Sequence, residues 1–386
     1  MNGEFFFICV GQSAFLAQRM NVPFLNLAAQ YQSLKEEILP AVERALAGAH
    51  YILGPNVAAF EQEIAAYTQT KFGVGVNSGS DALTLALRAL DLGPGDEVIT
   101  TPFTYIAPAE AIHQVGAKII FADIDAKTFN LDPAEVAKKI SARTRGIIPV
   151  HLFGQASPLK EIQALAEPRG IHIVEDCAQA IGAKYFGKPV GGFGRLGCFS
   201  FYPTKNLGAD GDGGMVVTSD ESLAKKLKML RVHGIERRYF HDLHGYNSRL
   251  DDIQAAILRV KLLHLDRWNS RRAEIARRYD EGLKKLPLQL PVTAEGNSHV
   301  FHVYAILSER RDALQKFLGD AGVPTIIYYP QPLHLQKVYA DLGYKLGDFP
   351  VAEKISEKIL PLPMYPELTN AQVDYVIEKI RQFAVG

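Results

Sequence analysis

Apolar runs of strand length alternate with amphipathic helical patterns from Met20 onward. Most of these runs are followed by a helical pattern and not by a second strand. This alternation is typical of an α/β domain in which helices flank a mostly parallel sheet. The predicted strands are 72–76, 97–100, 118–122, 144–150, 172–174, 197–201 and 214–217, and the predicted helices are 81–89, 107–115, 133–139, 158–167 and 222–232.

The pattern changes in the last third of the chain. One long helical pattern covers residues 251–279, and Pro287 and Pro291 then interrupt the sequence. Prolines placed in this way mark the entry to a new region. We therefore predict a large domain over residues 20–265 and a smaller C-terminal α/β domain over residues 266–386.

Residues 1–19 stand apart from this pattern. Phe5 to Val10 is an apolar stretch, but the only charge before it is Glu4. A secretory signal carries basic residues there, and a span of this length is too short to cross a bilayer. We favour an N-terminal extension or an upstream start codon over a signal sequence, and we expect no membrane segment.

Composition excludes several classes of partner. The chain has 386 residues, with 42 basic and 42 acidic side chains, so no net charge draws it to nucleic acid or to an anionic membrane surface. The 47% hydrophobic content is enough for a large core. Three cysteines, Cys9, Cys177 and Cys198, are too few for a disulfide framework, which indicates a reducing, cytoplasmic location.

Lys205 is the strongest candidate for chemistry. It follows an apolar strand pattern that ends in small, aromatic and polar residues, and such a pattern delivers one amine to a fixed point. A lysine presented in this way can form a Schiff base with an aldehyde cofactor. Asp176 ends another apolar stretch and supplies the carboxylate that a pyridine nitrogen requires. Together the two residues predict a pyridoxal phosphate site.

Residues 78–83 follow a predicted strand and open a helix, which is where backbone N–H groups and the helix dipole can bind a phosphate. An ordinary capping turn explains the same residues. Gly192 to Gly197 matches the dinucleotide motif G-x-G-x-x-G, but a turn precedes it and a strand follows, so the motif lacks its context. His241 and His244 have no neighbouring ligands that would complete a metal shell, so we predict no metal site.

Seven short runs in a fixed order resemble the nucleotide-sugar aminotransferases of the DegT type, which are fold-type I pyridoxal phosphate enzymes. The likeness extends from about residue 22 to the C-terminus, and the runs are more specific together than any one of them is alone. They are Ser78 to Leu83, Thr101 to Tyr105, His151 to Gly154, Glu175 to Gln179, Ser200 to Asn206, Gly211 to Gly214 and Gly245 to Asp251.

The resemblance implies a role for each residue of the cofactor site. Lys205 would bind the cofactor and carry the proton, Asp176 would keep the pyridine nitrogen protonated, and Gln179 would contact the phenolic oxygen. Tyr105 would stack on the ring. The phosphate would be held by Ser200, by the N–H groups of Gly79, Ser80 and Asp81, and by Asn247 of the other subunit of a homodimer that shares its active sites.

The family also implies the substrates, which are glutamate as amino donor and a nucleotide-linked keto-sugar as acceptor. Tyr202 and Tyr329 would face the sugar. Many relatives carry histidine where Tyr328 stands, and His334 is a candidate to replace that contact. Such enzymes serve amino-sugar biosynthesis, often for lipopolysaccharide, although antibiotic sugars use the same chemistry.

Other functions compete with this interpretation. The runs from Arg231 to Arg249 look more like relatives that aminate C3 of the sugar than those that aminate C4. Sugar dehydratases of the family replace the lysine with histidine, so Lys205 argues against them. A non-enzymatic regulatory protein that binds the cofactor would show no reaction with glutamate, and a nicotinamide oxidoreductase rests only on Gly192 to Gly197.

Overall fold

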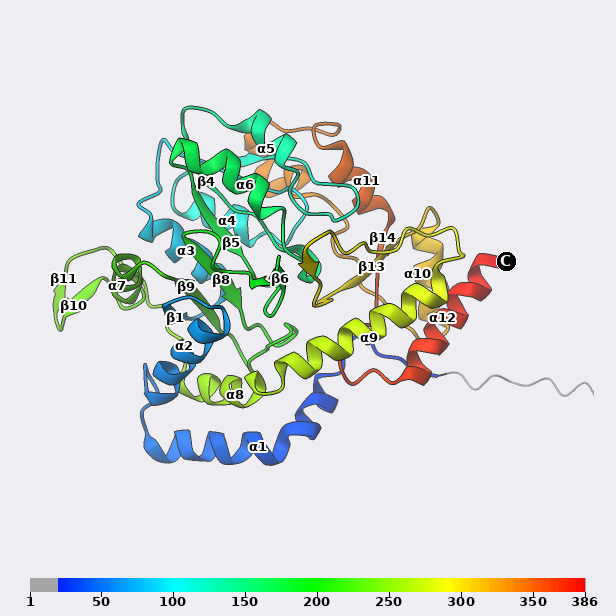
Figure 1. Ribbon diagram of the computed structural model, residues 1–386, viewed down its shortest axis with the longest axis horizontal. Coiled ribbons are helices and arrows are strands. Elements are labelled where there is room, and N and C mark those ends of the chain that lie inside the picture. The colour runs from blue at the N-terminus through cyan, green and yellow to red at the C-terminus, as the bar shows by residue number, and fades with distance from the viewer. Residues whose placement is uncertain (1–19, 386) are drawn as a thin grey trace, which may run out of the picture.

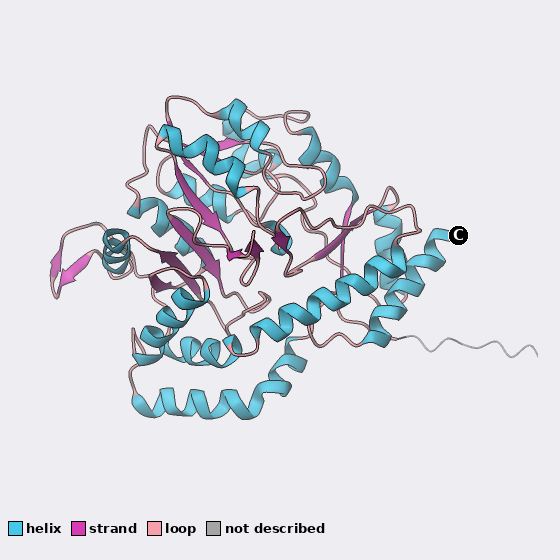
Figure 2. Ribbon diagram, in the orientation of Figure 1, coloured by secondary structure: helices cyan, strands magenta, loops and turns pink. Residues whose placement is uncertain are grey.

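A seven-stranded sheet forms the centre of the protein (Figures 1 and 2). The computed structural model describes residues 20–385, so the predicted extension over residues 1–19, with Cys9, lies outside the described residues. The strand order is β1-β9-β8-β5-β4-β2-β3, and only β9 runs antiparallel to its neighbours. The bounds are β1 Phe72–Val76, β2 Glu97–Thr100, β3 Lys118–Phe121, β4 Thr144–Ile147, β5 His172–Asp176, β8 Leu196–Ser200 and β9 Gly214–Thr218.

All seven predicted strands belong to this sheet, which confirms the mostly parallel α/β fold. The strand predicted over 144–150 is shorter than expected, because β4 ends at Ile147 and the chain then turns toward His151. The five helices predicted between the strands are also present. They are α3 Gly79–Ala89, α4 Ala107–Gln114, α5 Pro133–Lys139, α6 Leu159–Ala166 and α7 Glu221–Leu230.

Both faces of the sheet are buried, because consecutive strand residues point to opposite sides. Val174, Cys198 and Val216 pack in one cluster with apolar residues of α3, α4 and α7. Their neighbours Ile173 and Phe199 face the other side, where α5, α6 and α2 (Pro55–Tyr67) supply the contacts. This two-sided burial explains why the strands appear in the sequence as continuous apolar runs.

The N-terminal helix α1, Leu27–Gly48, packs along α8, Asp252–Leu262 (Figure 1). Leu34 and Ile38 of α1 meet Ile257 and Trp268 in a separate apolar cluster. Neither α1 nor α2 is predicted in the sequence analysis above. Pro40 lies inside α1 and weakens its helical pattern.

The long helix predicted over residues 251–279 is wrong in one respect. Two helices, α8 and α9 (Leu265–Leu283), replace it, and the break falls at Leu263 and His264. The two helices have different packing partners: α8 lies against α1 and α2, whereas α9 lies against α12, Asn370–Val385. Tertiary packing therefore sets the break, which no glycine or proline marks in the sequence.

The C-terminal region has its own apolar core, in which Tyr279 of α9 packs against Tyr304 and Ile377. A two-stranded antiparallel sheet crosses it. Within residues 20–385, no helix has the length and apolar character needed to cross a membrane. The remaining elements are β6 Lys184–Tyr185, β7 Lys188–Pro189, β10 Ile235–Arg237, β11 Phe240–His241, β12 Asn297–Ser298, β13 Tyr304–Leu307, α10 Arg311–Asp320, α11 Pro350–Lys358 and β14 Ile359–Leu362, with short 3-10 turns at 152–154, 167–169, 333–335 and 337–342.

Candidate active site

A cavity of about 450 Å³ opens at the carboxyl ends of β5 and β8. Ligand sites of parallel sheets lie at this edge, where several loops meet. Asp176 is the last residue of β5, and Lys205 lies in the turn that follows β8. Both residues line the cavity, so the structure brings together the two groups on which the sequence prediction rests.

The protein around the cavity shifts both groups toward their neutral forms. Burial lowers the pKa of Lys205 from its ordinary value to about 8, although the negative charge of Asp176 opposes this change. Burial likewise raises the pKa of Asp176, against the opposing effects of the Ala178 N–H and the Lys205 charge. The N–H of Ala178 donates to Oδ1 of Asp176 over 3.0 Å, which fixes the carboxylate. A lysine of lowered pKa is more often the free amine, which is its nucleophilic form.

The first turn of α3 lines the cavity with N–H groups that could hold an anion. Gly79 and Ser80 occupy the first two helical positions, where N–H groups have no acceptor within the helix. Gly79 packs directly against Ser200, and a β-carbon on Gly79 would lie 3.1 Å from the Ser200 Oγ. Only glycine therefore lets the helix end and the Ser200 hydroxyl approach one point, which suits a phosphate.

Asp81 does not contribute in the way predicted. Its backbone N–H donates to Oγ of Ser78, the N-cap residue, over 3.1 Å. Its carboxylate accepts a hydrogen bond from Ser248 over 2.6 Å. The N–H of Asp81 is therefore already satisfied by the cap, and only the N–H groups of Gly79 and Ser80 remain for a phosphate.

Gln179 lines the cavity beside Asp176 and lies in the turn that follows β5. Its Oε1 accepts a hydrogen bond from the Phe153 N–H over 2.7 Å. Its Nε2 donates to the hydroxyl of Tyr329 over 3.2 Å. An amide nitrogen carries two hydrogens, so Gln179 keeps one donor for a ligand in the cavity.

Four tyrosines surround the cavity: Tyr105, Tyr202, Tyr328 and Tyr329. Tyr105 and Tyr202 are 60% and 54% exposed, so each presents much of its ring to the open side. Tyr328 and Tyr329 are less exposed, and their ring centres lie 5.7 Å apart. These four predicted stacking and sugar-binding residues therefore face the same space.

Two predicted site residues lie elsewhere. His334 is buried beneath Phe349, and its Nε2 pairs with Glu353 over 2.9 Å, so it does not reach the cavity. The prediction of a substrate contact through His334 is corrected on this ground. Asn247 is exposed and does not line the cavity of its own subunit.

Several residues that line the cavity have no predicted role, among them Thr104, Asp212 and His302. Asp212 belongs to a run that carries the family resemblance, but we gave it no role. His302 comes from the C-terminal region, 97 residues after Lys205, and reaches the site only because β13 enters beside it. No local pattern in the sequence marks this contact.

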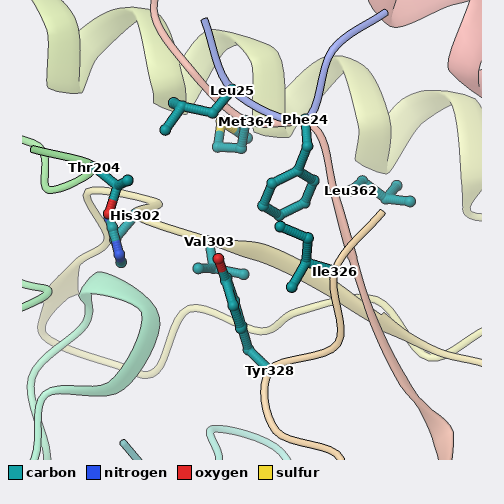
Figure 3. A pocket seen from close by; sticks show the side chains of 9 residues that line it. All are labelled: Phe24, Leu25, Thr204, His302, Val303, Ile326, Tyr328, Leu362 and Met364. Carbon is teal, nitrogen blue, oxygen red and sulfur yellow. The ribbon is translucent and has the colours of Figure 1, made fainter. Parts of the chain in front are cut away.

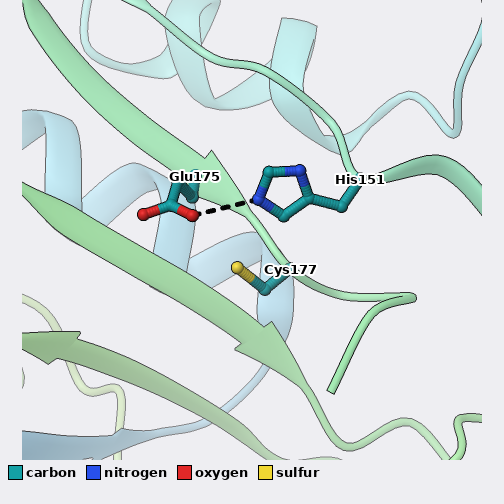
Figure 4. Close-up of side chains that lie close together, drawn as sticks. All are labelled: His151, Glu175 and Cys177. Carbon is teal, nitrogen blue, oxygen red and sulfur yellow. Dashed lines mark hydrogen bonds and ion pairs between the residues drawn. The ribbon is translucent and has the colours of Figure 1, made fainter. Parts of the chain in front are cut away.

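Glu175 and His151 form a buried pair behind the cavity (Figure 4). The Ser157 N–H donates to Nδ1 of His151, so Nε2 carries the proton and donates to Glu175 over 3.1 Å. Burial alone would raise the pKa of Glu175, but this bond and backbone donors hold it below its ordinary value. Cys177 lies close by, yet both nitrogens of His151 are engaged, which leaves the ring no lone pair for a metal.

Glu175 also explains the glycine pattern at 192–197. Its Oε1 accepts hydrogen bonds from the N–H groups of Phe193 and Gly194, each over 2.7 Å. A β-carbon on Gly194 would lie 2.5 Å from the Ile173 oxygen. The loop then enters β8, which confirms that the strand follows the glycines. These glycines serve close backbone packing, not dinucleotide binding.

Comparison with known proteins identifies the family. Residues 32–381 match the DegT/DnrJ/EryC1/StrS aminotransferase family. The chain is 51% identical to a pleiotropic regulatory protein of Geobacillus stearothermophilus over 94% of its length and 99% of the relative's. It is 47% identical to the UDP-N-acetyl-3-dehydro-alpha-D-glucosamine 3-aminotransferase of Acidithiobacillus ferrooxidans. That match covers 96% of this chain and 100% of the relative.

A solved structure agrees with the sequence relatives. The crystal structure of DesV from S. venezuelae in complex with a ketimine intermediate superposes with a TM-score of 0.93 at 46% identity, and the match covers 94% of this chain and 98% of that one. The cavity, its lysine and its carboxylate thus occur in a chain that matches aminotransferases along nearly its whole length. The chain belongs to the DegT/DnrJ/EryC1/StrS aminotransferase family.

Proposed function

We propose that this protein transfers the amino group of glutamate to the keto group of a nucleotide-linked sugar, with pyridoxal phosphate as cofactor. The observation that carries the proposal is that Lys205 and Asp176 line one cavity together with Gly79, Ser80 and Ser200. A family match over residues 32–381 supports it.

The cavity fits the cofactor at two places. Gly79 leaves room where a β-carbon would block the approach of Ser200, and the first N–H groups of α3 favour an anion there. Elsewhere in the cavity, the Ala178 N–H fixes the carboxylate of Asp176, which would pair with a protonated ring nitrogen. When bound, pyridoxal phosphate supplies an electron sink that makes the α-proton of an amino acid removable.

Lys205 is the group we assign to covalent attachment and to proton transfer. Its lowered pKa, about 8, leaves about a tenth of the amine unprotonated at pH 7, far more than an ordinary lysine has, so that it can act as nucleophile and then as base. Gln179 would donate to the phenolic oxygen with the Nε2 hydrogen that is not bonded to Tyr329. Tyr105, which lines the cavity, would pack against the ring of the cofactor.

The second substrate is assigned from the aromatic wall and from the relatives. Tyr202, Tyr328 and Tyr329 offer rings and hydroxyls of the kind that contact sugars. The relatives from Acidithiobacillus ferrooxidans and Streptomyces venezuelae are named as 3-aminating enzymes. We therefore assign amination at C3 and a place in amino-sugar biosynthesis. The buried thiols of Cys177 and Cys198 support a cytoplasmic location.

We further assign Asn247 to the active site of the partner subunit in a homodimer. It is exposed and lies outside its own cavity, in the chain segment between α7 and α8. The neighbouring β10 and β11 form a hairpin that extends away from the rest of the chain (Figure 1). A segment that projects from one subunit can complete the site of another.

The test separates an enzyme from a cofactor-binding regulator. Purified protein is loaded with pyridoxal phosphate, and its visible absorbance is recorded before and after glutamate and then after UDP- and dTDP-linked 3-keto and 4-keto sugars. We expect glutamate to bleach the visible band and a 3-keto sugar to restore it. Binding of the cofactor without any response to glutamate would indicate the regulatory alternative. Recovery with 4-keto sugars alone would move the assignment to C4.

A further inference from the structure

His302 stands where two cavities meet. Besides the large cavity, a smaller one of about 300 Å³ lies between the N-terminal segment and the C-terminal region, lined largely by apolar side chains such as Phe24, Ile326 and Met364 (Figure 3). Thr204, His302 and Tyr328 line both cavities. A molecule bound over Lys205 therefore has His302 at its side.

A chain of amides fixes which nitrogen of His302 carries the proton. Nδ2 of Asn269 donates to the Ile181 oxygen over 3.1 Å, so its Oδ1 faces Asn206. Nδ2 of Asn206 donates to that oxygen over 2.8 Å and to the Val300 oxygen over 3.0 Å. Backbone carbonyls only accept hydrogen bonds, so neither amide can be turned around without losing a bond.

The oxygen of Asn206 therefore faces Nδ1 of His302, at 3.1 Å, and Nδ1 must carry the hydrogen. Nε2 is then an acceptor with a free lone pair. No residue among 20–385 donates a hydrogen bond to Nε2 of His302. This atom is also not one of the fully buried polar atoms that lack a partner, so it is accessible from the cavity that His302 lines. Burial holds the pKa of His302 well below its ordinary value, as do the charges of Lys205 and Arg272, so the ring stays neutral.

A free acceptor nitrogen suits one of the two proposed substrates better than the other. The inference rests on the proposed function, because that function supplies the two substrates. Glutamate offers two carboxylates, which cannot donate a hydrogen bond, and an amino group that is consumed in the reaction. A sugar offers hydroxyl groups, which can donate. We propose that His302 is a specificity residue for the sugar, and that its Nε2 accepts a hydrogen bond from a sugar hydroxyl next to the reacting carbon.

The experiment compares the two half-reactions in the holoenzyme. His302→Phe keeps a ring of similar size but removes the acceptor, and His302→Gln keeps an acceptor oxygen. His113→Phe makes the same chemical change at an exposed position of α4, outside both cavities, and serves as the matched control. The rates of reaction with glutamate and with the keto-sugar are followed separately by the cofactor absorbance.

We expect His302→Phe to lower the kcat/KM of the sugar half-reaction by about tenfold, the effect of one neutral hydrogen bond, and to leave the glutamate half-reaction within about twofold. His302→Gln should recover part of the loss, and His113→Phe should match the wild type. A merely structural role would slow both half-reactions together. Equal losses in both, or no loss in either, would overturn the assignment.

Two further measurements do not depend on turnover. Calorimetry with UDP-N-acetylglucosamine and dTDP-glucose, which bear hydroxyls but no keto group, should show about tenfold weaker binding to His302→Phe. In protein labelled with ¹⁵N-histidine, the Nδ1 of His302 should carry the proton, and its Nε2 resonance should shift when a nucleotide sugar binds. A proton found on Nε2, or an Nε2 resonance that does not respond, counts against the inference.

The outcomes distinguish this inference from the proposed function. If the wild type reacts with glutamate but binds and converts no nucleotide sugar, the proposed function fails and the assignment of His302 fails with it. If the wild type converts the sugar and His302→Phe does so equally well, only the role of His302 is wrong. Unfolding midpoints of the variants show whether a loss comes from instability instead.

Discussion

A β-carbon added to Gly79 would lie 2.6 Å from the β-carbon of Ser200. Gly79 belongs to the first turn of α3, and Ser200 ends β8, so this contact joins the helix that we assign to the phosphate to the strand that leads to Lys205. Gly79→Ala should therefore push the two elements apart. We expect about tenfold or greater loss of affinity for pyridoxal phosphate, because overpacking of this kind costs about 1–3 kcal/mol.

A cofactor titration followed by the visible absorbance checks this prediction. Gly319→Ala is the matched control, because Gly319 lies inside α10 and a β-carbon there meets no atom within 4 Å. That change should leave cofactor affinity unaltered. Equal affinities for wild type and Gly79→Ala would show that the α3 turn can move without loss of the site.

The pKa of Lys205 predicts how cofactor loading depends on pH. The free amine is the nucleophile, and burial lowers its pKa to about 8. The rate at which the cofactor-free protein gains its visible band should rise with pH through about 8 and then level off. An unperturbed lysine would keep gaining rate up to about pH 10.

Asp176→Asn tests how the charge of Asp176 contributes to the pKa of Lys205. The charge of Asp176 raises the pKa of Lys205, so its removal should move the rise in loading rate to lower pH. Stopped-flow absorbance over a pH series gives both midpoints. A midpoint that moves upward or stays in place would contradict the electrostatic coupling between the two residues.

Glu175 should determine stability and not chemistry. It accepts hydrogen bonds from His151 and from the N–H groups of Gly191, Phe193 and Gly194. Glu175→Gln places an amide among these donors, which leaves at least one of them unpaired in the interior. We expect the free energy of unfolding to fall by about 3 kcal/mol.

Denaturant unfolding over a pH series measures this effect. A carboxyl whose pKa is lowered in the folded state contributes stability above its unfolded pKa and loses it as pH falls through the folded value. The gap between wild type and Glu175→Gln should therefore narrow in acid. Glu309→Gln, at an exposed ion pair with Lys358, should change stability by less than about 0.5 kcal/mol. A cost at Glu175 as small as this would show that the network is dispensable.

Mixing two inactive variants tests the shared active site. Lys205→Ala lacks the reactive amine, and Asn247→Ala lacks the contact that we assign to the partner subunit. In a mixed dimer, one site combines both changes and the other has neither. Random exchange should then restore about a quarter of all sites, since half of the dimers are mixed and each contains one intact site.

The rate of amino transfer before and after mixing gives the answer, with unmixed variants treated identically as controls. If Asn247 acted within its own subunit, the site with an intact Lys205 would still lack it and no activity would return. Mixing wild type with Lys205→Ala calibrates how completely subunits exchange. Absence of recovery despite full exchange would remove Asn247 from the partner site.

The sheet and the core of the site could be predicted from the sequence because both depend on local patterns. Buried strands appear as apolar runs, and Asp176 ends one such strand, whereas Lys205 lies in the turn after another. Gly79 and Ser80 were predictable because a strand, a turn and a helix start lie within a few residues of each other. These residues are close together in the sequence as well as in the structure, so a local pattern is enough to locate them.

Other features depend on contacts between distant segments. His302 reaches the cavity from the C-terminal region, and His334, only 32 residues later, is buried against Glu353 instead. The neighbouring residues in the sequence do not show which histidine lines the cavity, because both histidines adjoin apolar residues. The break between α8 and α9 likewise follows from their different packing partners.

Helix α9 links two parts of the protein that the sequence assigned to separate domains. Asn269 near its start holds the amide chain that ends on His302, whereas Arg272, one turn later, donates to the Phe301 and Met364 oxygens of the C-terminal region. The helix is uninterrupted between Asn269 and Arg272, so the two residues keep a fixed position relative to each other. Asn206, the residue next to Lys205, and the C-terminal region are therefore held by hydrogen bonds to one helix. The position of the residue beside Lys205 thus depends on a helix that is itself anchored in the C-terminal region.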